Sequence, residues 1–311
     1  MLYLTSINDY AAGQPAAVTV GKFDGVHLGH KLLTERLCRQ KEKGMVTVAV
    51  TFDIQPLWLT ENRKDVKLII TPAEKRHMLA EAGVDVLLEL PFDDTFMHMS
   101  PEAFIRMLKE RLDMEYMVVG SDFKFGYRGA GDIGQLKDLS VMHHFALEVV
   151  EKKQCNKRDI SSTYIREEIA AGHIKNAARL LGYPYYIYGE IVHGNRIGST
   201  KLDFPTINMI PSSEKLLPPN GVYITEVSVE GRIYKGVTNV GIRPTIAEHT
   251  KTVGVETHIL DFRADIYEKH AKVVFLDFIR QERAFASLDA LREQIASDVK
   301  TALRYFNDNN R

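Results

Sequence analysis

Two histidines in the segment GKFDGVHLGH, residues 21–30, are of a type and spacing that suggest chemistry. His27 and His30 stand three positions apart, so both rings can face the same side of a first helical turn. A helix N-terminus has unpaired N–H groups and a positive dipole, which favour phosphate. Gly29 has no side chain, which leaves room for a ligand ring against the backbone. The pattern fits a nucleotide site, but it also fits a glycine-rich turn with solvated histidines.

A second polar cluster lies in ISSTYIR, residues 160–166. Ser161, Ser162 and Thr163 are strong helix N-cap types, and Arg166 follows three residues later. Hydroxyls, amides and a guanidinium at one helix start can clamp a phosphate. An ordinary capped helix with a surface arginine has the same pattern, so the residues alone leave both interpretations open.

The elements that must position these clusters alternate in the first half of the chain. Apolar runs predict strands at residues 16–23, 45–52, 84–90 and 115–120. Capping patterns predict helices over residues 28–44, after Thr71-Pro72 and after Ser100-Pro101. The alternation predicts a doubly wound, parallel α/β sheet. Such sheets bind ligands at the carboxyl ends of their strands, where residues 21–30 fall.

The pattern changes near residue 182, where short strands replace helices. Residues 221–241 alternate about Glu230-Gly231, which predicts a hairpin, and residues 253–262 and 271–280 predict further strands. Frequent glycine turns favour a closed antiparallel β-barrel. A helix is expected behind Ser287. We therefore predict two domains, residues 1–181 and 182–311.

Composition excludes several classes of protein. Of 311 residues, 45% are hydrophobic and 26% charged, as in soluble globular proteins. The formal net charge of -1 gives no basic field for nucleic acid. Two cysteines, Cys38 and Cys155, form neither a disulfide framework nor a zinc motif. Without a signal-peptide pattern or a long apolar stretch, we expect a cytoplasmic protein with no membrane partner.

The two polar clusters together resemble the nucleotidyltransferase superfamily. The segment VVGSDFKFGYRGAGD, residues 118–132, narrows the resemblance to the bacterial bifunctional riboflavin kinase/FMN adenylyltransferases. The second half is similar to their kinase domain in five ordered segments: FPTIN (204–208), GVYITEV (221–227), VGIRPT (240–245), VETHILDF (255–262) and LDFIRQERAF (276–285). The resemblance covers nearly the whole chain. It implies an enzyme of FAD biosynthesis that uses ATP and Mg²⁺ to convert riboflavin to FMN, and ATP to convert FMN to FAD and pyrophosphate.

By this resemblance, His27 and His30 hold the ATP phosphates as charge builds in adenylyl transfer. Arg166 grips the leaving phosphates together with the hydroxyl cluster. The implied ATP-binding residues of this half are Gly21, Phe23, Asp24, Gly29, Ser161, Ser162 and Thr163. The implied flavin-binding residues are Asp122, Phe123, Phe125 and Arg128.

In the second half, the resemblance implies that Thr206 and Asn208 bind Mg²⁺ and ATP phosphate, since their oxygens suit a hard cation. Glu256 is implied as the general base for the ribityl hydroxyl. The remaining implied residues are Arg280 and Glu282 at the flavin and Gly194 and Gly198 at the ATP phosphates.

One departure from the family pattern keeps an alternative open. Asp203 stands before FPTIN, where the family usually has glycine; aspartate lacks glycine's conformational freedom and repels phosphate. The alternative is an FMN adenylyltransferase with an impaired kinase barrel. Two other hypotheses are a nucleotidyltransferase for another small phosphate, such as that of pantetheine or nicotinate, and a non-catalytic flavin or RNA sensor. FPTIN disfavours the first, and the lack of an aromatic RNA-binding motif makes RNA a poor partner.

Overall fold

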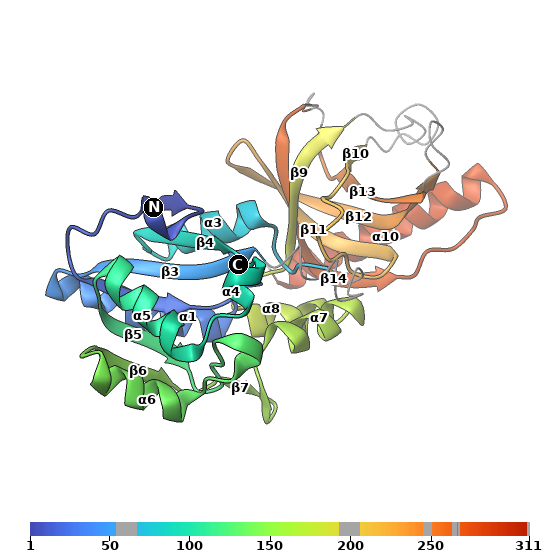
Figure 1. Cartoon of the computed structure of the whole chain (residues 1–311). Coiled ribbons are helices and arrows are strands. Elements are labelled where there is room, and N and C mark those ends of the chain that lie inside the picture. Colours follow the sequence, from blue (N-terminus) through green and yellow to red (C-terminus); the bar gives the residue numbers. More distant parts are fainter. Residues whose placement is uncertain (54–66, 193–205, 245–250, 263–265, 267, 310–311) are drawn as a thin grey trace. The chain divides into compact units, whose positions relative to one another are not determined.

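The chain folds as two units, Met1–Tyr164 and Ile165–Arg311, in the computed structural model (Figure 1). The structure describes residues 1–53, 67–192, 206–244, 251–262, 266 and 268–309. The first unit is α/β and the second is built around a barrel, as the sequence predicts. The contacts place α8 (Ile174–Leu181) in the second unit, whereas the pattern of the sequence groups it with the first.

A six-stranded sheet forms the centre of the first unit, with strand order β1-β4-β3-β2-β5-β6. Every neighbouring pair is parallel. The strands are β1 (Leu2–Leu4), β2 (Ala16–Val20), β3 (Val46–Asp53), β4 (Val86–Pro91), β5 (Met114–Gly120) and β6 (Ala146–Val150). From β2 the chain goes first to β3 on one side and later to β5 on the other. The gap between β2 and β5 is therefore a topological switch point, where sheets of this kind bind ligands.

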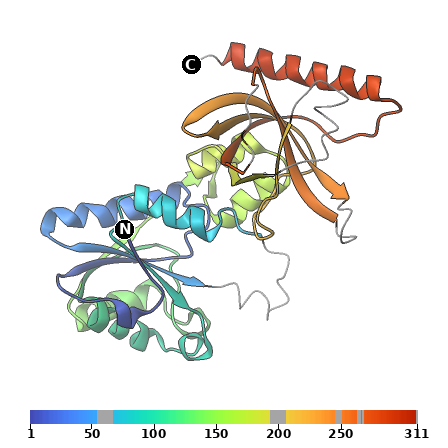
Figure 2. The same cartoon turned by 90° about the horizontal axis from the view of Figure 1, so that it is seen from above.

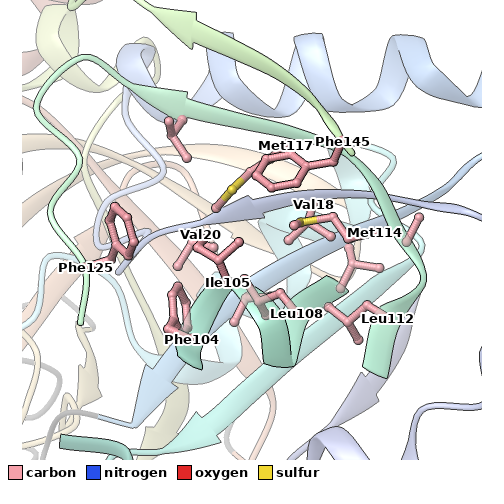
Figure 3. Close-up of a cluster of buried hydrophobic side chains, with 14 of the residues drawn as sticks. Val18, Val20, Phe104, Ile105, Leu108, Leu112, Met114, Met117, Phe125 and Phe145 are labelled. Carbon is pink, nitrogen blue, oxygen red and sulfur yellow. The ribbon is translucent and has the colours of Figure 1, made fainter. Parts of the chain in front are cut away.

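Helices pack against this sheet and bury it. Phe104, Leu108 and Leu112 of one helix lie in the same buried cluster as Val18 and Val20 of β2 (Figure 3). All five residues of β2 are buried, which explains its continuous apolar run. Among the described residues before α7, the helices are α1 (Leu28–Cys38), α3 (Pro72–Glu81), α4 (Asp94–Met97), α5 (Pro101–Leu112), α6 (Ile133–Met142) and the 3₁₀ helices η1 (Ile7–Asp9), η2 (Arg39–Lys43) and η3 (Tyr127–Gly129).

Capping residues set the starts of these helices. The Thr71 hydroxyl accepts from the Glu74 N–H at 3.2 Å, and Glu74 accepts from the Thr71 N–H at 2.7 Å. Ser100 caps α5 through the Ala103 N–H. Each such cap stabilises its helix by about 1 kcal/mol. The predicted capping box and Ser100 cap are confirmed. The predicted helix over residues 28–44 is α-helical only to Cys38 and ends as 3₁₀ turns before Gly44.

A closed antiparallel barrel forms the second unit, with strand order β10-β13-β12-β11-β14-β9. Its strands are β9 (Tyr186–Val192), β10 (Thr206–Met209), β11 (Gly221–Val229), β12 (Arg232–Pro244), β13 (Lys251–Ile259) and β14 (His270–Arg280). Glu230 and Gly231 have φ values of 49° and 76°, as a two-residue hairpin turn between β11 and β12 requires. The predicted hairpin and barrel are confirmed.

A long C-terminal helix, α10 (Leu288–Asp308), packs against the barrel (Figure 2). Ser287 caps it by accepting from the Ala290 N–H at 3.1 Å, as predicted. Ala302 and Phe306 of α10 are buried with Val222 and Val237 of β11 and β12. The helix thereby covers one outer face of the barrel and supports the strands beneath it.

Several elements of the structure lie outside the strands and helices that the sequence pattern predicts. They include β1, β6, α6, and a short hairpin of β7 (Gln154–Cys155) and β8 (Arg158–Asp159), which leads into α7 (Ser162–Ala170). Among the residues that the structure describes, no helix is both long and apolar enough to cross a bilayer.

Candidate active sites

The histidine turn, residues 21–30, joins the carboxyl end of β2 to α1 at the switch point of the sheet. His27 is the N-cap residue of α1. Its Nδ1 accepts from the N–H groups of Gly29 at 3.2 Å and His30 at 3.4 Å. Two amides expected to face phosphate are thus engaged by His27. Because Nδ1 accepts, the neutral ring carries its proton on Nε2, and this N–H is the donor that His27 retains for a ligand.

His30 lies against His27, with ring centroids 3.7 Å apart and planes at 19°. Its Nδ1 is buried and has no hydrogen-bond partner among the described residues. Buried polar atoms in proteins are normally paired. A ligand that meets this nitrogen would supply the missing contact, so the histidine pair has the character of a binding site rather than of a solvated turn.

The pKa values of both histidines are depressed. Burial, followed by the charge of Lys152, lowers the pKa of His27 to about 4, while Asp122 opposes the shift. Burial and the neighbouring His27 lower the pKa of His30 well below its ordinary value. Both rings are therefore neutral at pH 7. An anionic ligand would raise both pKa values, because it favours the charged form of each ring.

The backbone before the histidines is strained. Phe23 and Val26 have φ values of 50° and 35°, a region that costs a non-glycine residue about 1–3 kcal/mol. The fully buried Phe23 ring lies 5.2 Å from the His30 ring. A Cβ at Gly21 would meet the Phe23 ring at 3.3 Å, and one at Gly29 would meet the His27 ring at 3.1 Å. The space beside Gly29 is thus occupied by His27.

Asp24 ties the histidine turn to two distant segments. Its buried carboxylate accepts from the N–H groups of Ile69 at 2.9 Å and Ile70 at 3.2 Å. Its carbonyl accepts from the Ser162 hydroxyl at 2.8 Å. The two polar clusters of the sequence, 138 residues apart, are therefore joined by a direct hydrogen bond.

The other residues of the hydroxyl cluster have different environments. The Ser161 hydroxyl accepts from the Tyr164 N–H at 3.2 Å and so caps α7. Thr163 is exposed. Arg166 lies one turn further along α7. The hydrogen bond from Ser162 to the Asp24 carbonyl brings the start of α7, with Ser161, to the histidine turn.

A charged cluster lies at the ends of β5 and β6. Lys152 Nζ is 2.7 Å from Asp122 Oδ2 and 3.7 Å from Asp159 Oδ2. Asp122 follows β5, and Asp159 is the last residue of β8, just before Ser161. Sequence reasoning found Asp122 alone, because nothing in the spacing of Lys152 or Asp159 indicates that they meet.

Phe123 and Phe125 stack at 5.3 Å with planes 11° apart. Phe125 is buried in the sheet core (Figure 3), and Phe123 packs against that core. Phe104 and Phe96 extend the contact, and Phe96 lies 5.0 Å from Phe52 at the end of β3. The two predicted flavin-binding rings are thus part of a larger aromatic wall, which sequence reasoning did not foresee.

Arg128 lies in η3 with φ of 52°, and its guanidinium is 5.1 Å from the Tyr127 ring. Both side chains are exposed. The Tyr127 ring also stacks on His98 at 4.9 Å. Arg128 therefore follows the aromatic wall along the chain and keeps its charge at the surface.

Thr206, Asn208 and Glu256 come together in the barrel. Asn208 of β10 is directly opposite Glu256 of β13, and the Thr206 hydroxyl donates to Glu256 Oε1 at 2.7 Å. A hydroxyl, an amide oxygen and a carboxylate form a donor set that fits Mg²⁺, which takes few protein ligands beside substrate phosphates. The described residues hold no group of three or more His, Cys, Asp or Glu side chains arranged for a metal. Gly194, Gly198 and Asp203 lie outside the described residues.

Arg280 is the last residue of β14, and Glu282 follows just after it. The Arg280 guanidinium clamps the buried Asp298 of α10 at 2.8–3.0 Å. Glu282 Oε1 accepts from Asn239 Nδ2 at 3.0 Å, and Asn239 is opposite Glu256 in the sheet. A Cβ at Gly241 would collide with the Glu282 carboxylate. Glu282 is thus held close to the strand that carries Asn239, beside the candidate base.

Comparison with known proteins covers both units. A sequence model of the FAD synthetase family matches residues 10–164, and one of riboflavin kinase matches residues 181–306. The bifunctional riboflavin kinase/FMN adenylyltransferase of Haemophilus influenzae is 37% identical over 94% of this chain and 95% of its own. The enzyme of Escherichia coli K12 is 36% identical over 95% of this chain and 94% of its own. The enzyme of Bacillus subtilis is 34% identical over 94% of this chain and 93% of its own.

This chain belongs to the bifunctional riboflavin kinase/FMN adenylyltransferase family. The resemblance predicted from the sequence is confirmed, and with it the enzyme class and the order of the two domains. Both domain models match, so the alternative with an impaired barrel is not favoured. A crystal structure from Streptococcus pneumoniae described as a macrolide-efflux protein has a TM-score of 0.86 and 28% identity, covering 97% of this chain and 98% of its own.

Three features of the two candidate sites were not predicted from the sequence. They are the Lys152 cluster, the aromatic wall beyond Phe123 and Phe125, and Asn239 between the two glutamates. Aromatic residues near strand ends could have indicated the wall. No comparable signal marks Lys152 or Asn239, because their partners are distant in sequence.

Proposed function

We propose that this member of the family makes FAD in two ATP-dependent steps, with FMN adenylyltransferase chemistry in residues 1–181 and riboflavin kinase chemistry in residues 182–311. The observation that carries the proposal is the stacked pair of the buried His27 and the half-buried His30 at the switch point of the parallel sheet. A site for nucleotide phosphates is expected there. The barrel adds Glu256 beside Thr206 and Asn208.

In adenylyl transfer, an FMN phosphate oxygen attacks the α-phosphorus of ATP. A new P–O bond forms while the bond to the β-phosphate oxygen breaks, and pyrophosphate leaves. No protein nucleophile is needed, so the protein contributes position and charge stabilisation. His27 donates from Nε2 to the phosphate oxygens, and His30 meets them with its unpartnered ring nitrogen. Ser161, Ser162, Thr163 and Arg166 hold the leaving phosphates.

The half-buried Phe123 ring takes the flavin ring of FMN, since flat rings pack well on aromatic faces. The buried Phe125 ring supports Phe123 by stacking on it. Arg128 meets the FMN phosphate. Four residues of the histidine turn act on ATP through the shape of the turn: Gly21, Phe23, Asp24 and Gly29. Their contacts fix the backbone that carries the two histidines.

In the kinase reaction, Glu256 accepts the proton of the ribityl 5′-hydroxyl as that oxygen attacks the γ-phosphorus of ATP. The bond from the γ-phosphorus to the β-phosphate oxygen breaks, and ADP leaves. Thr206 and Asn208 would hold Mg²⁺, which supplies charge neutralisation at the ATP phosphates when bound. The Thr206 hydroxyl orients the Glu256 carboxylate. Glu282 and Arg280 border the flavin, and Gly194 and Gly198 border the ATP phosphates. The partners are small molecules, without nucleic acid or membrane, and the enzyme acts in the cytoplasm.

Product analysis by chromatography tests both halves. Purified chain and MgATP are incubated with riboflavin in one tube and with FMN in another. We expect FMN and FAD in the first tube and FAD in the second. Product only in the FMN tube would establish the impaired-kinase alternative. No product in either tube would overturn the proposed function.

A further inference from the structure

Lys152, Asp122 and Asp159 form a charged cluster at the carboxyl edge of the first sheet. Parallel strands bring their carboxyl ends to one edge, and β2, β5 and β6 are consecutive in the sheet order. His27 follows β2, Asp122 follows β5 and Lys152 follows β6. The three side chains therefore start from neighbouring strand ends, at the edge where the substrate of the proposed reaction must lie.

The contacts show that Lys152 is held at this edge. Its ammonium lies 2.7 Å from Asp122 and 3.7 Å from Asp159. The Ser121 N–H bonds to the Val150 carbonyl at 2.9 Å, and the Ile160 N–H to the Lys153 carbonyl at 2.9 Å. The backbone on both sides of the cluster is thus cross-linked. Two carboxylates from separate segments hold one ammonium in place.

The charges of the cluster also shift the pKa of His27 in the histidine turn. The charge of Lys152 lowers the pKa of His27, and that of Asp122 raises it. Both effects are charge–charge interactions with the imidazole. The hydrogen bond to Asp122 is the largest cause that raises the pKa of Lys152 itself. Lys152 is therefore a charged ammonium whose field reaches the neutral imidazole of His27.

A stabilising role does not explain this cluster. The Lys152 side chain is 28% exposed and that of Asp122 is 63% exposed, and exposed ion pairs contribute about 0–1 kcal/mol. Adenylyl transfer, by contrast, brings two phosphate-bearing substrates to two uncharged histidines. Charge building at the reacting phosphate needs a cation close by.

We propose that Lys152 binds the reacting phosphate in adenylyl transfer, and that Asp122 and Asp159 hold its ammonium at the strand edge that also carries His27 before substrate arrives. This inference rests on the proposed FMN adenylyltransferase function. It gives Asp122 a positioning role, acting through Lys152, in place of a direct contact with flavin. When substrate enters, a phosphate oxygen replaces one carboxylate as the partner of the ammonium, and no bond to the protein forms.

The test compares Lys152→Met and Lys152→Arg with a matched control, Lys124→Met. Lys124, on the same loop after β5, forms a longer and more exposed ion pair with Asp132 at 3.7 Å. FAD formation from FMN and FMN formation from riboflavin are measured on each full-length variant. The kinase reaction of the same molecule reports on folding and concentration, and the melting temperature of each variant is recorded.

We expect Lys152→Met to lower kcat for FAD formation by about 10- to 100-fold, the loss typical of one hydrogen bond to a charged group. Lys152→Arg keeps a cation, so its kcat for FAD formation should lie nearer to that of wild type than to that of Lys152→Met on a logarithmic scale. Lys124→Met should leave FAD formation within about twofold of wild type, and all variants should keep riboflavin phosphorylation.

Two results would overturn the inference: FAD formation by Lys152→Met within about threefold of wild type, or Lys152→Arg as impaired as Lys152→Met. Each would show that the charge does not act on the reacting phosphate. Failure of the wild-type chain to form FAD from FMN would instead overturn the proposed function, and the two failures are therefore distinguishable.

Discussion

The two sites of this protein are built in opposite ways. In the first unit, the histidines sit on a strained turn after β2, where backbone hydrogen bonds and buried rings fix their position. In the second unit, Thr206, Asn208 and Glu256 project from regular strands of a barrel. In the proposed mechanisms, the first site uses neutral donors and the Lys152 cation, whereas the second uses the Glu256 carboxylate. The comparison indicates that a loop site needs many tertiary supports, while a strand site takes its geometry from sheet register.

The strand site should depend most steeply on one side chain. Glu256→Gln removes the proposed proton acceptor but keeps an oxygen for the Thr206 hydroxyl. We expect riboflavin phosphorylation to fall by about 100- to 10,000-fold, the range of general-base catalysis. Conversion of FMN to FAD, measured on the same preparation, should be unchanged. Equal loss of both reactions would show that the two sites are not independent.

The mirror-image experiment is His30→Asn in the loop site. The variant loses the ring that stacks on His27 and its unpartnered nitrogen. FAD formation should fall by about 100- to 1,000-fold, the loss seen when one transition-state donor is removed, while the kinase reaction persists. Steady-state rates of both reactions check this. A kinase loss as large as the adenylyl-transfer loss would contradict the division of labour.

A smaller effect is expected from Asn239→Ala, which removes the hydrogen bond to Glu282 but not the candidate base. The loss should be about tenfold in kcat/KM for riboflavin, corresponding to one hydrogen bond to a charged group. If Asn239 acts through Glu282, the double variant Asn239→Ala/Glu282→Ala should be no worse than Glu282→Ala alone. Additive losses would refute that coupling.

The loop site should also make the first unit sensitive to acid. The pKa of His27 is about 4 in the folded protein, against 6.5 for an unperturbed histidine. The unfolded chain therefore binds more protons between these values, so stability is full above pH 6.5 and is lost as pH falls toward 4. The contribution is on the order of 3 kcal/mol, and the depressed pKa of His30 acts in the same direction.

Chemical denaturation of wild type and His27→Asn between pH 7 and pH 4 checks this. In the variant, the unfolding free energy of the first unit should depend less on pH, because one titrating ring is gone. An unchanged slope would mean that His27 is not buried as a neutral ring.

Local signals predicted much of the fold. Thr71 with Glu74, Ser100 and Ser287 marked helix starts because their side chains bond to amides within three residues. Glu230 and Gly231 marked a hairpin because few residues tolerate positive φ. The edge strands β1 and β6 gave weaker signals, since an edge strand needs less apolar sequence than a central one.

The candidate sites were predictable only in part. His27, Ser162 and Glu256 belong to recognisable segments, and the resemblance to the family named them. The hydrogen bond from Ser162 to the Asp24 carbonyl joins residues 138 positions apart. The contacts of Lys152 with Asp122 and Asp159 likewise depend on the order of strands in the sheet. The spacing of residues along the sequence does not predict such contacts.

By itself, the sequence determined the family, the two fold classes, the helix caps and the residue types at each site. These properties depend on short-range chemistry, such as a side chain bonding to a nearby amide or a run of apolar residues. The tertiary structure decided that His27 caps its own helix, that His30 Nδ1 has no hydrogen-bond partner among the described residues, and that Lys152 meets Asp122 and Asp159. Those facts depend on which strand ends become neighbours and on burial, and burial depends on the whole fold rather than on any one segment.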